Sequence, residues 1–449
     1  MLSTTTPDTP KVAEPSVCEL VNERGHSRYV ENVMWVGVGK ELSAFTGQDE
    51  PDLDIDPPSD TSPTSILGES LVFGRSVVNL SDQHPSPSRI IWLWSTYLEN
   101  VNLLVRILHI PTVQPLILNM ASDPSRPKTK EALLFSIYLA AICSVPQCDH
   151  AEAERIMGQP ISELIQLYTG LAQQALINAR FLQTPNFLTL QALTLFLVAQ
   201  RARLDPQTMW QLTGVAIRSA QQLGYHREKA LRSSSISVFQ AELRRRLWWE
   251  LTLLESFAAK QCGVMSMISF RSLWDTDRPL NINDSALHPE MKDVPQDVTG
   301  VTEMSFCSAR FEVGELTIAY TSPDRALQDS RDVDAAIEDL EQRLENRLLK
   351  YCDPSIPMHK LLRLFCRGAV TRIKLILAEA PNSFARDKAI QKYLWQANAF
   401  FPIDAFMFLL GEIAYRTIEQ PLPVPLETVW AEIEKAYEYQ PRLLYDESN

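Results

Sequence analysis

From Ile90 onward, apolar residues recur with a spacing close to that of an α-helix, and only short breaks separate the runs. This spacing places one apolar stripe on each helix, which a neighbouring element must cover. Alternation with a period of two, which half-buried strands require, is almost absent. The 449-residue chain has only 15 glycines, so few positions suit tight hairpins. The pattern therefore predicts an all-α fold, built as a large helical bundle.

One helix can be predicted with both of its ends. Asp205 is a suitable N-cap, and Pro206 follows it at the first helical position, where the missing N–H costs nothing. Gly224 is a natural stop, because glycine readily adopts the left-handed conformation that ends many helices. We therefore predict a helix over Pro206–Leu223.

A second helix is predicted over about Val238–Cys262, where Ser237 and Gln240 stand at capping-box spacing. Apolar residues occupy two of its faces, which is typical of a helix at the centre of a domain. A third helix, predicted from Asp334 to Lys350, has a narrow apolar stripe among charged residues. We expect this helix on the surface.

The first 88 residues have a different composition. Residues 47–64 read GQDEPDLDIDPPSDTSPT, which is acidic, proline-rich and without helical periodicity, and a Ser/Pro-rich break covers residues 81–88. Such composition is typical of disordered segments and linkers. We therefore expect a mostly disordered or linker segment over residues 1–88 and a helical domain over residues 89–449. Neither a membrane-spanning run nor a secretory signal is evident, so we expect a nuclear or cytoplasmic protein and no membrane partner.

Signature motifs of enzymes are missing from the sequence. It contains no phosphate-binding loop, no paired histidines at zinc-binding spacing on one helix, and no nucleophile elbow. The seven histidines are dispersed and the seven cysteines lie mostly in apolar runs, so we expect neither a metal site nor a cofactor. Glu255 is of interest because it lies in the most apolar helix. We expect it to pair with an arginine or, as the alternative, to have a raised pKa.

The formal net charge of −13 argues against tight binding of a polyanion unless a separate basic patch exists. The best candidates for such a patch are Arg244, Arg245 and Arg246, with Arg201 and Arg203 as weaker ones. Long arginine stems readily cover apolar surface, so we interpret the three consecutive arginines as ion-pair partners at the edge of the core. We therefore expect no direct nucleic-acid binding.

The same arginines begin a run that resembles a known family. RRRLWWELTLLES (residues 244–256), followed by FAAKQCG and DTDRPLNINDSALHPEM, resembles the middle homology region of fungal zinc-cluster transcription factors. Residues 209–228, 301–315, 351–359 and 404–416 resemble further parts of that region in the same order. Residues 25–42 resemble the stretch that follows the zinc cluster. The resemblance therefore covers nearly the whole chain.

The resemblance implies an all-α regulatory domain with a central cavity that senses effectors or partners. The DNA-binding module of this family needs six closely spaced cysteines that hold two zinc ions. Cys18 is the only cysteine before Gly25 in this sequence. We therefore expect the zinc-cluster module to be missing, and DNA binding through it to be excluded.

Two functions remain open at this point. The first is a transcription-factor-like regulator without its own DNA-binding domain, tied to a fungal secondary-metabolite gene cluster. It would act with a DNA-bound protein partner or a small hydrophobic effector. The second is a cofactor-independent enzyme, of the cyclase or Diels–Alderase type, that holds a hydrophobic terpenoid or polyketide in the cavity. A gene product without activity is a third reading. For either function, the core motif of the family directs attention to Trp248, Trp249, Glu255, Tyr225, His226 and Arg278.

Overall fold

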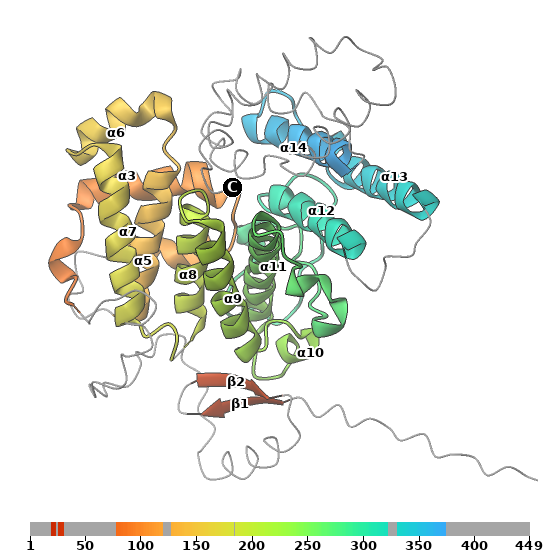
Figure 1. Ribbon diagram of the computed structural model, residues 1–449, viewed down its shortest axis with the longest axis horizontal. Coiled ribbons are helices and arrows are strands. Elements are labelled where there is room, and N and C mark those ends of the chain that lie inside the picture. The colour runs from red at the N-terminus through yellow and green to blue at the C-terminus, as the bar shows by residue number, and fades with distance from the viewer. Residues whose placement is uncertain are drawn as a thin grey trace, which may run out of the picture.

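Helices account for nearly all regular structure in the part of the chain that the structure describes (Figure 1). The computed structural model describes residues 19–23, 26–30, 78–119, 127–183, 185–321 and 330–373. The prediction of an all-α fold is thereby confirmed. In chain order the helices are α3 (Pro87–Thr96), α4 (Ile110–Leu118), α5 (Lys128–Cys143), α6 (His150–Met157), α7 (Ile161–Asn178), α8 (Phe187–Gln200), α9 (Pro206–Gln222), α10 (Glu228–Leu231), α11 (Val238–Gln261), α12 (Ser305–Thr321), α13 (Ser330–Arg347) and α14 (Pro357–Ile373).

The first group of helices is built around α5, which packs against α7, α8 and α3. Every residue from Glu131 to Cys143 is buried, because α5 is apolar around nearly its whole circumference. The same is true of α8, buried from Thr189 to Gln200. A full capping box starts α8: Asn186 accepts from the N–H of Thr189, whose side chain accepts from the N–H of Asn186. A π-helix, Tyr97–Asn102, follows α3 directly.

Helices α9 and α11 form the centre of the molecule, shown in green in Figure 1, and they pack against each other. Their ends agree with the sequence prediction to within one residue. The Asp205 carboxylate accepts from the Thr208 N–H at 2.9 Å, and the Ser237 hydroxyl accepts from the Gln240 N–H at 3.2 Å. Both faces of α11 are buried, as its two apolar stripes predicted.

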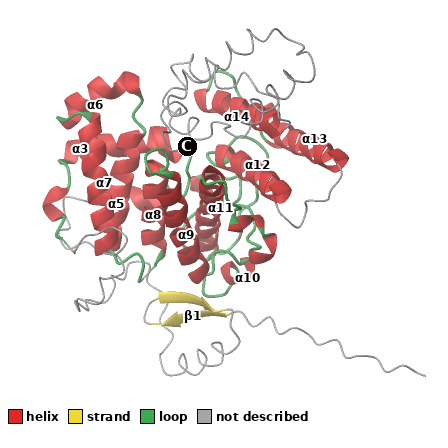
Figure 2. Cartoon of the chain, viewed as in Figure 1, coloured by secondary structure: helices red, strands yellow, loops and turns green. Residues whose placement is uncertain are grey.

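Helices α12, α13 and α14 complete the fold on the other side of α11 (Figure 2). At Gly314 of α12 an added Cβ would collide with Leu253 of α11, so glycine lets the two helices approach closely. The predicted surface helix is α13, which begins at Ser330, four residues before the expected start. Its charged face reaches α12, where Arg343 and Arg347 pair with the buried carboxylate of Glu312.

A short antiparallel hairpin is the exception to the helical architecture in the part of the chain described. Strand β1 (Glu19–Glu23) pairs with β2 (His26–Val30), so that Glu19 stands opposite Val30. The hairpin lies within the stretch predicted as linker, and β2 lies against α9. The acidic segment 47–64, most of the stretch 25–42 and residues 374–449 of the predicted domain fall outside the described residues.

Within the described ranges, no single helix is both long and apolar enough to cross a membrane. Judged by length and composition alone, Lys128–Cys143 and Gln147–Met157 together could form a membrane span, but the chain bends by 95° between them.

A buried ion pair joins α11, α12 and the segment after the π-helix. Arg310 of α12 forms two parallel hydrogen bonds to the Glu250 carboxylate of α11, at 2.9 and 3.0 Å, and also donates to the carbonyl of Leu104 at 2.7 Å. Both charged side chains are at most 2 % exposed. A bidentate arginine–carboxylate pair of this kind fixes orientation as well as distance.

We predict that Glu250→Gln lowers the free energy of unfolding by about 3–5 kcal/mol, because it removes the negative charge against which the buried Arg310 is held. Urea denaturation of the purified chain measures the loss. Glu338→Gln, at an exposed position on α13, is the matched control and should change stability by less than about 0.5 kcal/mol. Equal stability of Glu250→Gln and the control would contradict a stabilising role of the Glu250–Arg310 ion pair.

Candidate functional site

Three buried tryptophans form an aromatic cluster at the centre of the molecule. Trp248 and Trp249 are neighbours on α11, and Trp274 comes from the irregular segment that follows this helix; all three are at most 1 % exposed. Trp274 packs edge-on against both, with ring centroids 6.0 and 5.3 Å apart. The Trp249 indole donates to the carbonyl of Asp277 at 2.8 Å. The two tryptophans of the family-like motif thus hold the following segment against α11.

Tyr225 and His226, at the turn after α9, are buried against the same segment. The carbonyl of Tyr225 accepts from the Thr276 hydroxyl at 2.6 Å, and the carbonyl of His226 accepts from the N–H of Asp275 at 3.0 Å. The His226 ring lies 6.0 Å from that of Trp248. Four of the six predicted site residues are therefore brought together, from α11 and the α9–α10 connection.

Arg278 pairs with carboxylates of α12. Its side chain is 37 % exposed and pairs with two carboxylates of α12, Glu312 at 3.4 Å and Glu315 at 3.5 Å. The arrangement makes Arg278 a tie between the irregular segment and α12. It stays a candidate ligand-binding residue.

Glu255 has no arginine partner among the described residues, so the pairing that we favoured is wrong and the alternative applies. Its carboxylate accepts from the hydroxyl of Ser266 and, at 3.3 Å, from the N–H of Met267. Burial raises the pKa of Glu255, and the hydrogen bonds from Ser266 and from the backbone only partly offset this. The carboxyl therefore anchors the residues that follow α11.

The second of the three consecutive arginines is an ion-pair partner at the edge of the core, as we interpreted it. Arg245 donates to Glu228 of α10 at 2.5 and 3.1 Å. Burial alone would raise the pKa of Glu228, but hydrogen bonds from Arg245 and Arg232 lower it to about 2. The Glu228 carboxylate also accepts from the N–H of Asp277, so this pair holds the start of the irregular segment.

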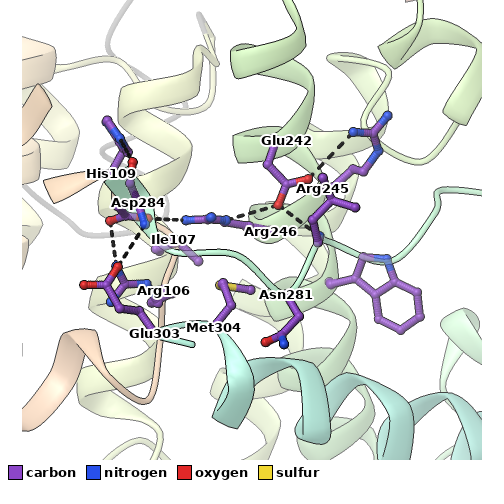
Figure 3. A network of polar contacts seen from close by, with 12 residues as sticks. Arg106, Ile107, His109, Glu242, Arg245, Arg246, Asn281, Asp284, Glu303 and Met304 are labelled. Carbon is purple, nitrogen blue, oxygen red and sulfur yellow. Dashed lines mark hydrogen bonds and ion pairs between the residues drawn. The ribbon is translucent and has the colours of Figure 1, made fainter. Parts of the chain in front are cut away.

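Arg246 is fully buried and bridges two carboxylates, as Figure 3 shows. It donates to Glu242, one turn earlier on α11, at 3.2 Å and to Asp284 at 2.8 Å. Asp284 in turn pairs with Arg106 at 2.7 Å, and Arg106 also pairs with Glu303 at 2.7 Å. Burial raises the pKa of Asp284, but Arg246 and Arg106 outweigh it, and the pKa is lowered. We call Arg106, Glu242, Arg246, Asp284 and Glu303 the charge network.

The polar side chains around Asp284 cap neighbouring helices. Asp284 accepts from the N–H of Ile110, the first residue of α4, at 3.3 Å. Asn283 accepts from the N–H of Glu303, just before α12, at 2.9 Å. Asn281 donates to the carbonyls of Val298 and Gly300 and accepts from two hydroxyls of the α12 N-terminus. The irregular segment is therefore fixed at residues 281–284.

Sequence reasoning missed Arg106, Trp274 and Glu303. No local pattern marks them, because Arg106 meets Glu303 across 197 residues. In the described residues, no three histidine, cysteine, aspartate or glutamate side chains gather as a metal site.

Comparison with known proteins identifies the family of this chain. Residues 94–299 match the model of the fungal specific transcription factor domain. The chain is 31 % identical to the aurofusarin cluster transcription factor aurR2 of Gibberella zeae, over 94 % of this chain and 67 % of that protein. It is 29 % identical to the pyriculol/pyriculariol biosynthesis cluster transcription factor 1 of Pyricularia oryzae, over 95 % of this chain and 62 % of the relative. It is 31 % identical to the transcriptional regulator AacuB of Aspergillus aculeatus, over 78 % of this chain and 52 % of that protein.

The chain thus spans between about half and two thirds of the length of these curated relatives. No solved structure matches it. The matched family region contains the motif with Trp248 and Trp249, the aromatic cluster and most of the charge network. This match, and the similarity to aurR2 over 94 % of the present chain, show that the chain belongs to the fungal specific transcription factor family.

Proposed function

We propose that this chain is the regulatory body of a transcription regulator that controls a fungal secondary-metabolite gene cluster in the nucleus. The observation that carries the proposal is the similarity, over 94 % of the chain, to a protein named as a cluster transcription factor. Two further relatives are named as a biosynthesis cluster transcription factor and a transcriptional regulator. A helical domain held together by buried ion pairs is suited to binding an effector or a protein partner.

The regulator would reach its genes through a DNA-bound protein partner. The chain carries a net charge of −13, and its best basic candidates do not form a free basic face. Arg244 and Arg246 are buried, and Arg245 is committed to Glu228. The attraction to phosphates that drives non-specific DNA binding is therefore weak in this chain.

The enzyme alternative needs an open apolar space large enough for a whole terpenoid or polyketide. The three tryptophans of the aromatic cluster fill the space between α11, α12 and the irregular segment with their own rings. This packing favours the regulator over a cyclase, and no contact among the described residues favours the enzyme.

The direct test is deletion of the gene, followed by transcript measurement for the neighbouring biosynthetic genes. We expect their transcripts to fall together at least tenfold, with genes outside the cluster as the internal control. Unchanged transcripts together with an accumulated biosynthetic intermediate would refute the regulator and support the enzyme.

We also predict that the purified chain does not bind a random 20-base-pair duplex at physiological salt with a Kd below about 100 μM, the weak end of non-specific binding. Fluorescence anisotropy of a labelled duplex measures this, with a basic DNA-binding protein as positive control. Saturable, salt-dependent binding at low micromolar concentration would contradict the need for a DNA-bound partner.

A further inference from the structure

Arg244 differs from the two arginines that follow it. Arg245 and Arg246 each pair with a carboxylate of α10 or α11, whereas no carboxylate pairs with Arg244 in the described part of the chain. Its side chain is only 5 % exposed, and neither Nε nor Nη1 has a hydrogen-bond partner. A buried guanidinium without a counter-charge is costly. Arg244 lacks the carboxylate partner that offsets this cost at Arg245 and Arg246.

A second unsatisfied donor lies on the same face of α11. Trp248 follows Arg244 by four residues, so the two side chains are neighbours on adjacent turns. The Trp248 ring is fully buried, and its Nε1–H donates to no acceptor, whereas the indoles of Trp249 and Trp274 both donate to backbone carbonyls. Buried polar groups are nearly always paired, so two unpaired side chains at one place need an explanation.

Aromatic rings line this place and extend toward the surface. The Arg244 guanidinium carbon lies 5.4 Å from the centre of the Tyr225 ring. The Tyr225 ring contacts Phe187 at 6.4 Å, and Phe187, at the start of α8, is only half-buried. The His226 ring flanks Trp248 at 6.0 Å. The donors of Arg244 and Trp248 are therefore bordered by aromatic side chains from α8 and from the connection between α9 and α10.

The unsatisfied groups are all donors, so the missing partner is an acceptor, and the positive charge of Arg244 selects an anion. Carboxylates match the planar guanidinium best, and planar rings stack well beside tyrosine and tryptophan. We infer that Arg244 and Trp248, with Tyr225 as the stacking wall, form a site for a small planar aromatic ligand that carries a carboxylate or an ionised phenol. The inference rests on the proposed function, since it names the class of effector that the regulator would sense.

The first test needs no ligand. We expect Arg244→Met to raise the melting temperature of the purified chain by roughly 2 °C or more, because it removes an uncompensated buried charge. Arg245→Met, the matched control one residue along, should lower it, because Glu228 loses a partner. A melting temperature that falls in Arg244→Met as it does in Arg245→Met would make Arg244 a structural residue and overturn the site.

The second test uses salicylate as the probe, titrated into the full chain and followed by calorimetry. We expect saturable binding that weakens at least tenfold in Arg244→Met and in Trp248→Phe, and for the neutral analogue salicylamide. Arg155→Met, which removes an arginine that is 74 % exposed on α6, should bind salicylate as the unmodified chain does. Absence of saturable binding, or equal binding by all variants, would overturn the inference.

These two measurements are independent of the transcript experiment. Loss of cluster transcripts on gene deletion, without salicylate binding, refutes the ligand site and leaves the regulator intact. Salicylate binding that depends on Arg244, without any change in transcripts, refutes the regulator and leaves the site.

Discussion

Arg246 is enclosed between Glu242 of its own helix and Asp284 of the irregular segment, and all three side chains are at most 5 % exposed. Removing three charges from water is costly, so the arrangement is stable only if each charge keeps its partners. Asp284 has a second ion-pair partner in Arg106, and Arg106 in turn pairs with Glu303. The network therefore sets the distance between α11, the segment before α4 and the start of α12, and the aromatic cluster packs within that frame.

Buried ion pairs of this kind contribute specificity more than net stability. Apolar contacts are non-directional, so they do not by themselves select one position of the irregular segment. The polar contacts fix the position of this segment: Asp284 pairs with two arginines, and Asn281 donates to the carbonyls of Val298 and Gly300.

Local chemistry made much of this structure predictable. Capping by Asp205 and Ser237 and the apolar faces of α11 gave the helix ends, because these signals act over three or four residues. The hairpin at 19–30 was not expected, since five-residue strands leave only a weak pattern. Arg106 meets Glu303 across 197 residues, and Arg246 meets Asp284 across 38, so periodicity could not assign these pairs. At Glu255 we expected an ion pair with an arginine, whereas burial and the Ser266 hydroxyl decide its state.

The irregular segment from Trp274 to Glu303 has consequences for how this family can change. Surface loops usually accept insertions and deletions with little effect. Between Asp277 and Asp284, however, a single added residue would shift Asp284 away from two arginines or Asn281 away from its carbonyls. This part of the segment has the backbone of a loop but tolerates insertions as poorly as a core helix. Changes in length among related proteins should therefore gather elsewhere, in stretches that carry no buried charge.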